Sequence, residues 1–211
     1  LHNFQNSQYI ITVAATDYAG NVTSYSSPGA SVLVSAPGGG GSDQASKIIH
    51  EHHIKNALIN IGGNIMAIGQ HGSKSWRVGI QDPRGAQAIA KVDLPDGWAI
   101  GTSGDYQRYF INDGKRYCHL INPLTGYPVE GIYSVTVLIE PSQNAGTLSD
   151  VLSKPLFISK KENRKDMAKK LGIYHYLIIE EKHISMTKTM ADKIQFLNPL
   201  TQKNNQIEIT L

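Results

Sequence analysis

The chain has 211 residues, of which 40% are hydrophobic and 18% are charged, so it has the composition of a globular protein and not of a disordered one. The formal net charge of +3 is too small, and the basic residues are too scattered, to indicate a nucleic-acid partner. The single cysteine, Cys118, excludes an intrachain disulfide, and no apolar run approaches the ~20 residues that span a bilayer.

Residues 1–37 have the pattern of short strands, with β-rich runs at 9–15 and 32–34 and a turn at 17–21. Parts of this segment resemble an internal piece of subtilisin-like serine proteases. A Ser-His-Asp mechanism needs three groups in mutual contact, and the segment contains none of that triad, so we do not expect a protease. The chain begins with Leu1 and not with methionine, and we expect it to be a fragment.

Residues 38–42 have the sequence GGGGS, whose composition is flexible, and they are predicted to form a linker or a junction. From Asp43 the pattern changes to alternating helix and strand. A helix is predicted at 43–56, with Ser42 or Asp43 as its N-cap, and Gly62-Gly63 is predicted to join two strands in a hairpin. Further strands are expected at 57–61, 64–68, 76–80, 87–92, 98–101, 133–139 and 175–179.

A second hairpin is predicted from 106–111 and 116–121, because Asn112-Asp113-Gly114 is a strong turn signal. Helices are expected at 145–158 and 162–171, with Pro155 kinking or ending the first of them. The predicted fold class is α+β: an antiparallel sheet with packed helices, preceded by the short β-rich segment.

Three stretches carry chemical information. Residues 102–105 (TSGD) are small and polar and follow a predicted strand, so their N–H groups and hydroxyls could hold a phosphate or a flavin edge, although an ordinary turn is the simpler reading. His119 precedes the rigid turn 122–128 (NPLTGYP). A lone histidine in a strand is more often a core residue than a catalyst.

Asp150 lies in the third stretch, 149–157 (SDVLSKPLF), near the start of a predicted helix. A carboxylate there is either a cap or a hard oxygen ligand for Mg²⁺, which commonly binds one or two protein carboxylates together with substrate phosphates.

The order and spacing of these stretches resemble those of the FAD:protein FMN transferases, the ApbE-like flavin transferases. The resemblance runs from about Asp43 to near Asn198 and corresponds to the C-terminal half of a typical member. Segment 58–65 (LINIGGNI) looks like the glycine-glycine strand pair of that family. His119, followed by two apolar residues and then by Asn122 and Pro123, matches the family's histidine pattern throughout.

The resemblance implies an enzyme that binds FAD and Mg²⁺ and transfers FMN to a threonine hydroxyl of an acceptor protein, with release of AMP. It assigns FAD binding to Thr102, Ser103, Gly104, His119 and Leu120, and catalytic roles to His119 and Asp150. It also makes Asp150 the metal ligand. Lys154 stands where the family has a threonine, and a charged ammonium cannot ligate a cation.

The resulting domain organisation is a subtilase-like fragment (1–37), a linker or junction (38–42), the transferase-like half (43–198) and a tail (199–211). The family's Lys-Gly-Tyr-Ala-like segment should precede Asp43, and glycines stand there instead. We therefore expect little or no activity from this chain. A non-catalytic fusion fragment or binding module is the alternative. Family members usually work outside the cytoplasm, so the resemblance also implies an extracytoplasmic location.

The run 50–53 (HEHH) suggests a metal site at first sight. Its spacing does not match the zinc-protease pattern of two histidines four residues apart, and a solvated helix surface is the favoured interpretation.

Overall fold

The computed structural model describes residues 10–16, 32–37, 41–197 and 206–210, and side chains are described from Gly41 onward. The chain forms two compact units. Unit 1 contains Leu1–Trp76, Leu94–Gly101 and Ile139–Asp150, and unit 2 contains Arg77–Asp93, Thr102–Leu138 and Val151–Leu211. The boundary between the units crosses several strands and one helix. Each unit is described by itself below.

Unit 1 is built on strands that pair in the order β2, β1, β3, β4 and the first half of β7. β1 runs parallel to both β2 and β3, whereas the β3–β4 and β4–β7 pairs are antiparallel. The bounds are β1 (Ile10–Thr16), β2 (Val32–Pro37), α1 (Gly41–Glu51), β3 (Ala57–Ile61), β4 (Asn64–Ile68) and β7 (Ala99–Gly104).

The core of unit 1 forms between α1 and these strands. Ala45 and Ile49 lie four residues apart on one helix face and are buried with Ile59, Met66 and Ile68. β3 and β4 meet at Gly62 and Gly63, both of which have positive φ, so the two-glycine hairpin that the sequence predicted is present.

Unit 2 contains antiparallel strands in the order β10, β11 and β12, with β14 parallel to β12. A three-stranded sheet has the order β13, β6, β5, and β8 pairs only with β9 among the described strands. The strands are β5 (Trp76–Gln81), β6 (Ala88–Leu94), β8 (Tyr109–Asn112), β9 (Lys115–Cys118), β10 (Ile132–Ile139), β11 (His175–Glu180), β12 (His183–Thr187), β13 (Ile194–Phe196) and β14 (Gln206–Thr210).

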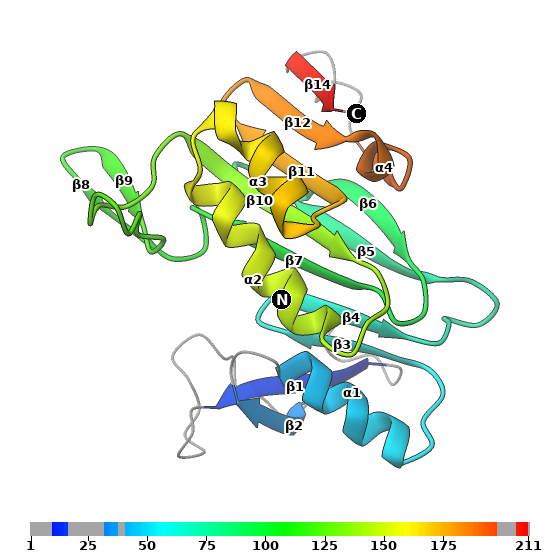
Figure 1. The fold of residues 1–211 in the computed structure, drawn as a ribbon. Helices are drawn as coiled ribbons and strands as arrows, with labels where there is room; N and C mark the ends of the chain where they lie inside the picture. The colour runs from blue at the N-terminus through cyan, green and yellow to red at the C-terminus, as the bar shows by residue number, and fades with distance from the viewer. Residues whose placement is uncertain (1–9, 17–31, 38–40, 198–205, 211) are drawn as a thin grey trace. The chain divides into compact units, whose positions relative to one another are not determined.

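Helices accompany the strands of unit 2: α2 (Ala145–Ile158), whose first six residues belong to unit 1, the 3₁₀ turn η2 (Lys161–Asn163), α3 (Arg164–Leu171) and α4 (Lys188–Ala191). Leu156 and Phe157 of α2 are fully buried in the core with Val135, Val137 and Ile178. Figure 1 shows α2 and α3 beside β10 and β11. No helix in the described part of the chain combines the length and the apolar character that crossing a membrane would take.

The α+β prediction, with antiparallel pairs dominating, is confirmed. Two details differ from the sequence prediction. α1 begins at Gly41, inside the predicted linker, and ends at Glu51 and not at Asn56, because the chain turns at His53, which has φ 57°. β7 extends to Gly104, so all but the last residue of the predicted turn at 102–105 belongs to a strand. α2 has the predicted bounds and does not end at Pro155.

Candidate functional site

His119 follows β9 at the end of the β8–β9 hairpin, and its side chain is exposed. Its backbone N–H donates to the carbonyl oxygen of Arg108 at 3.2 Å, and its ring Nδ1 lies 3.2 Å from the same oxygen. A carbonyl oxygen can only accept, so this contact is a hydrogen bond when Nδ1 carries the proton. The neutral ring then has its lone pair on Nε2, which makes Nε2 the atom able to take a proton.

The turn after His119 is held by its own backbone. The carbonyl of Asn122 accepts from the N–H groups of Thr125 and Gly126, and its side-chain Oδ1 accepts from Leu124 at 2.9 Å. Gly126 has φ +74°, which a glycine adopts without strain. Leu120, which is buried, accepts through its carbonyl from Val129 at 2.9 Å. The rigid turn that the sequence predicted is therefore present and anchors the chain on both sides of it.

The end of β7 carries Thr102, Ser103 and Gly104. The Thr102 hydroxyl pairs with that of Thr136 at 2.8 Å, and the buried Ser103 hydroxyl pairs with that of Ser153 at 2.7 Å. A Cβ on Gly104 would lie 2.3 Å from the Tyr106 ring, so only glycine fits there without a shift. Ser103 thus connects β7 to α2, a role that a predicted turn did not suggest.

A charged cluster that the sequence analysis missed lies immediately after β7. Arg84 donates two hydrogen bonds to the Asp105 carboxylate, at 2.7 and 2.6 Å, and its guanidinium stands 3.4 Å above the Tyr133 ring. The hydrogen bond with Asp105 raises the pKa of Arg84. Arg116 lies 3.7 Å from the same carboxylate. Burial, followed by the charges of Asp105 and Asp82, raises the pKa of Tyr106 to about 12.

Arg84, Tyr106 and Arg116 border a hollow of about 270 Å³, which is also lined by Gln81, Asp82, Pro83, Gly85 and Ala86. The Arg84–Asp105 pair joins residues that are 21 positions apart in the chain. No local motif marks Arg84 in the sequence, and only the tertiary fold reveals its partner.

Unit 1 contains a second polar cluster, at the start of α2. The Asp43 carboxylate accepts from the backbone N–H groups of Gly146 and Thr147, both at 2.8 Å, and from the Thr147 hydroxyl at 2.6 Å. Asn64 donates to the Gly146 carbonyl and to the Ser149 hydroxyl. Ser42 or Asp43 was predicted to cap α1, and Asp43 does not have that role. It lies in the first turn of α1 instead, and its carboxylate caps α2.

Asp150 is exposed on α2, next to this cluster in the chain. A Cβ on Gly101 would lie 2.3 Å from the Ser149 carbonyl oxygen, so β7 and α2 approach closely just before Asp150. Lys154 follows one helical turn later. Asp150 belongs to unit 1, whereas His119, Lys154 and residues 102–104 belong to unit 2, and the two sets are described separately.

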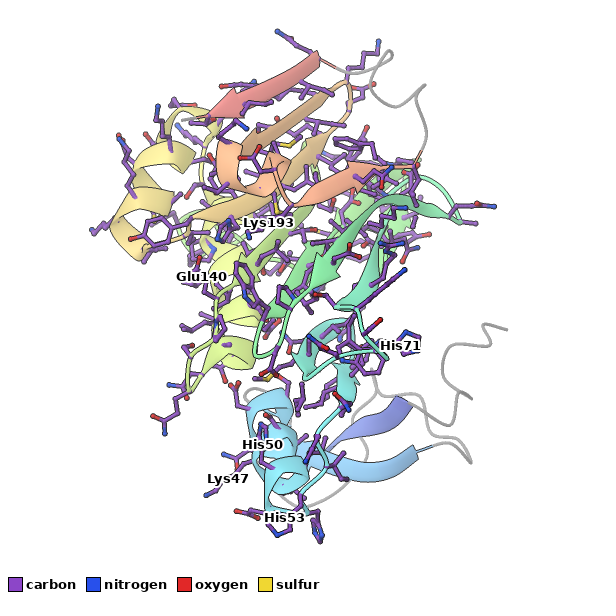
Figure 2. The ribbon with its side chains drawn as sticks, turned by 90° about the vertical axis from the view of Figure 1, so that its right-hand side faces the viewer. Lys47, His50, His53, His71, Glu140 and Lys193 are labelled. Atoms are coloured by element: carbon purple, nitrogen blue, oxygen red, sulfur yellow. The ribbon has the colours of Figure 1, made fainter. Side chains whose placement is uncertain are left out.

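Within the ranges that the structure describes, no three His, Cys, Asp or Glu side chains are grouped to hold a metal ion. Figure 2 shows His50 and His53, with Lys47 nearby, at the α1 end of unit 1. All three are exposed, which agrees with the solvated surface that the sequence favoured.

Comparison with solved structures identifies the class of fold. The apo form of the Pseudomonas stutzeri flavinyl transferase ApbE is 30% identical to this chain with a TM-score of 0.59, and the alignment covers 74% of this chain and 49% of that one. The ApbE protein from Thermotoga maritima is 29% identical with a TM-score of 0.56, over 78% of this chain and 50% of that one.

Sequence comparison gives the same family. A sequence model of the ApbE family matches residues 26–177, which is more than half of the chain. The FAD:protein FMN transferase of Rhodobacter capsulatus is 37% identical over 67% of this chain and 27% of its own length, and that of Haemophilus influenzae is 34% identical over 75% and 46%. The chain belongs to the ApbE family.

The chain spans about half of the solved structures that it matches, and less than half of these two curated relatives. The family match begins at residue 26, inside segment 1–37, for which a resemblance to subtilisin-like proteases was expected; the comparisons do not support that expectation. The predicted domain boundaries stay a prediction.

Proposed function

We propose that this chain forms part of an FAD:protein FMN transferase, which moves FMN from FAD to a threonine hydroxyl of an acceptor protein and releases AMP. Membership of the ApbE family supports the class of reaction. The observation that carries the proposal for this chain is the His119 ring, whose Nδ1 faces a carbonyl and whose Nε2 is left to accept a proton.

In the proposed reaction the threonine oxygen attacks the phosphorus of the FMN half of FAD. A bond forms between that oxygen and phosphorus, and the phosphoanhydride bond to the AMP half breaks. His119 Nε2 takes the hydroxyl proton, and AMP leaves with the negative charge of the broken bond. The carbonyl of Arg108 holds the ring in the tautomer that this step requires.

Mg²⁺ is part of the proposal, and the donors on α2 allow it. Asp150 supplies an exposed carboxylate, and Mg²⁺ can bind one protein carboxylate together with substrate phosphates and water. When bound, the ion would neutralise charge on the leaving phosphate. Lys154 replaces the family's threonine, and its ammonium is suited to contact a phosphate oxygen and not the metal. We propose that this replacement lowers the metal affinity of the site.

The experiment measures two quantities on the purified chain: FAD binding by isothermal titration with Mg²⁺, and AMP release from FAD by chromatography. A threonine-containing acceptor protein is included in parallel and analysed by mass spectrometry for an FMN adduct. In keeping with the low activity expected of this chain, we expect a small amount of adduct and of released AMP that His119→Ala or Asp150→Ala abolishes, whereas Tyr174→Ser, an exposed change in unit 2, leaves both intact.

The alternative is a non-catalytic binding module, which Lys154 favours because it departs from the metal-binding pattern. FAD binding without AMP release or adduct, unaffected by His119→Ala, would support the module and contradict the transferase. We further propose an extracytoplasmic location, on the ground of family membership alone.

A further inference from the structure

The β8–β9 hairpin of unit 2 carries an unusual amount of exposed apolar surface. In β8, Tyr109, Phe110 and Ile111 are 44%, 60% and 63% exposed. Leu124 and Tyr127, in the turn that follows His119, are 93% and 72% exposed. Contiguous exposed apolar side chains of this size are typical of protein–protein contact sites. In Figure 1 the hairpin stands apart from β10, β11 and β12 of the same unit.

The exposed residues lie on both faces of the hairpin. The register pairs Tyr109 with Cys118 and Phe110 with Tyr117, and side chains alternate between faces along each strand. Tyr109 and Ile111 therefore share one face, and Phe110 lies on the other, where it stacks on Tyr117 with ring centroids 5.1 Å apart. Packing against the rest of unit 2 would cover one face at most, so only a partner that contacts both faces would bury all of this apolar surface.

The outer edge of β8 offers such a partner a hydrogen-bonding template. In the described part of the chain no third strand joins this two-stranded sheet. The bond from His119 N–H to the Arg108 carbonyl fixes which residue pairs bond across the hairpin. By antiparallel alternation, the backbone N–H and C=O groups of Tyr109 and Ile111 point away from β9. An extended segment can add to that edge, and its side chains then flank both faces.

The charge beside the hairpin indicates which segment fits. The Arg116 guanidinium lies 4.1 Å above the Tyr109 ring, on the face that carries Ile111. Its nearest carboxylate in the described residues, that of Asp105, is 3.7 Å away and already accepts two hydrogen bonds from Arg84. Arg116 therefore keeps donor capacity for an additional carboxylate. It also borders the hollow of about 270 Å³ that Tyr106 lines.

We propose that the outer edge of β8 docks an extended segment of the acceptor protein, with apolar side chains over Tyr109, Phe110 and Ile111 and an acidic side chain facing Arg116. This inference rests on the proposed function for the identity of the partner. The strand pair that includes β8 leads directly to His119, so a segment bound there is held next to the residue proposed to take the threonine proton. The hairpin supplies affinity for the acceptor and takes no part in the chemistry.

The test uses the full chain and a short fluorescein-labelled peptide in which valine and threonine alternate and glutamate flanks both ends. Fluorescence anisotropy compares the wild type with two variants of the edge. Ile111→Asp places a charge on the apolar face, and Ile111→Pro removes an outward N–H group. Tyr174→Ser removes an equally exposed aromatic side chain elsewhere in unit 2 and serves as the control.

We expect the wild type and Tyr174→Ser to bind alike, and Ile111→Asp to lower the affinity by about tenfold or more, since it removes a buried apolar contact of the complex. A peptide with lysine in place of glutamate should bind more weakly than the glutamate peptide. Equal binding by Ile111→Asp and the wild type, or no binding by the wild type, would overturn the proposal. So would a wild-type dimer, detected by size-exclusion chromatography, that Ile111→Asp dissociates, because the edge would then be an interface between copies.

FAD binding, measured by isothermal titration without any peptide, separates this inference from the proposed function, because transfer of FMN and release of AMP need an acceptor. Ile111→Asp should leave FAD binding unchanged, which also shows that the variant is folded. Absence of FAD binding in the wild type, combined with Ile111-dependent peptide binding, contradicts the transferase and supports the docking edge. FAD binding by the wild type, combined with peptide binding that is the same in the wild type and in Ile111→Asp, contradicts the docking edge alone.

Discussion

Lys154 is the residue at which this chain departs from the threonine that the proposed Mg²⁺ site calls for, and a single substitution tests the consequence. Lys154→Thr removes an ammonium that repels a cation and restores an oxygen donor one helical turn after Asp150. On the proposed function, we expect Mg²⁺-dependent FAD binding to tighten by about tenfold, the scale on which supporting groups affect metal sites. Isothermal titration at several Mg²⁺ concentrations measures the change.

Lys154→Met is the matched control, since it removes the charge without adding an oxygen. If Mg²⁺-dependent FAD binding tightens equally in the threonine and methionine variants, the cause is the loss of charge repulsion and not ligation of the metal by an oxygen. If FAD binding tightens in neither variant, Lys154 does not face the metal, and its proposed effect on metal affinity is wrong.

Tyr106 gives a prediction about pH. Burial, with Asp105 and Asp82, raises its pKa to about 12, above the ordinary value near 10. The folded state therefore favours the protonated phenol. Below pH 10 the phenol is protonated in both the folded and unfolded states, and this stabilising contribution is fully present. Between about pH 10 and 12 the unfolded chain loses the proton first, so the contribution is lost as the pH rises.

The size of that loss follows from the shift, roughly 2 kcal/mol or somewhat more. Urea unfolding between pH 9 and 11.5 should show a steeper fall in the free energy of unfolding for the wild type than for Tyr106→Phe, in which the group cannot titrate. Because other tyrosines and lysines titrate over the same range, the difference between the two proteins is the quantity to compare. Parallel curves would show that Tyr106 titrates normally.

Among the elements, the start of α2 depends on a residue from α1. Asp43 satisfies two backbone N–H groups and one hydroxyl there, and its negative charge lies at the positive end of the helix dipole. Asp43→Ala should lower the free energy of unfolding by about 1–3 kcal/mol. Asp43→Asn keeps an acceptor oxygen and should cost less. Urea denaturation monitored by circular dichroism measures both variants. An alanine variant as stable as the wild type would contradict this role.

The elements that could be predicted are those whose signals are local. β3 and β4 were predicted with the bounds that they have, because Gly62 and Gly63 separate two apolar runs. The second hairpin was predicted from its turn, where Asp113 and Gly114 both have positive φ, although its strands are shorter than expected. The turn at 122–128, after His119, could likewise be predicted from the sequence, because the hydrogen bonds of Asn122 that hold it join residues close together in the chain.

What could not be predicted depends on contacts between distant residues. β7 extends through Ser103 because it lies beside β10, a pairing that residues 98–101 alone do not reveal. The Asp43–Thr147 contact spans 104 positions, and no spacing in a single sequence indicates it. The sequence pattern therefore gave the candidate site residues, which stay a prediction, whereas the long-range contacts of Asp43, Asn64 and Arg84 required the fold.

At the scale of the whole molecule, the N-terminal strands β1 and β2 are joined to β3 by a ladder of backbone pairs. β1 pairs in parallel with β3, with Ile10 to Thr12 opposite Leu58 to Asn60, and β2 pairs with β1. A passenger segment would leave β3 as a stable edge after its removal. The observed pairing instead makes β1 the strand that occupies the backbone edge of β3.

Deletion of residues 1–37 distinguishes these two cases. Removing β1 and β2 exposes the unpaired backbone edge of β3, and such an apolar edge is a template for pairing with another chain. We expect the shortened chain to lose more than about 5 °C of its thermal midpoint and to self-associate, as measured by scanning fluorimetry and light scattering. A shortened chain that remains monomeric with an unchanged midpoint would show that residues 1–37 are a separable appendage. The predicted boundary near Asp43 would then be supported, and the β1–β3 ladder would contribute nothing to stability.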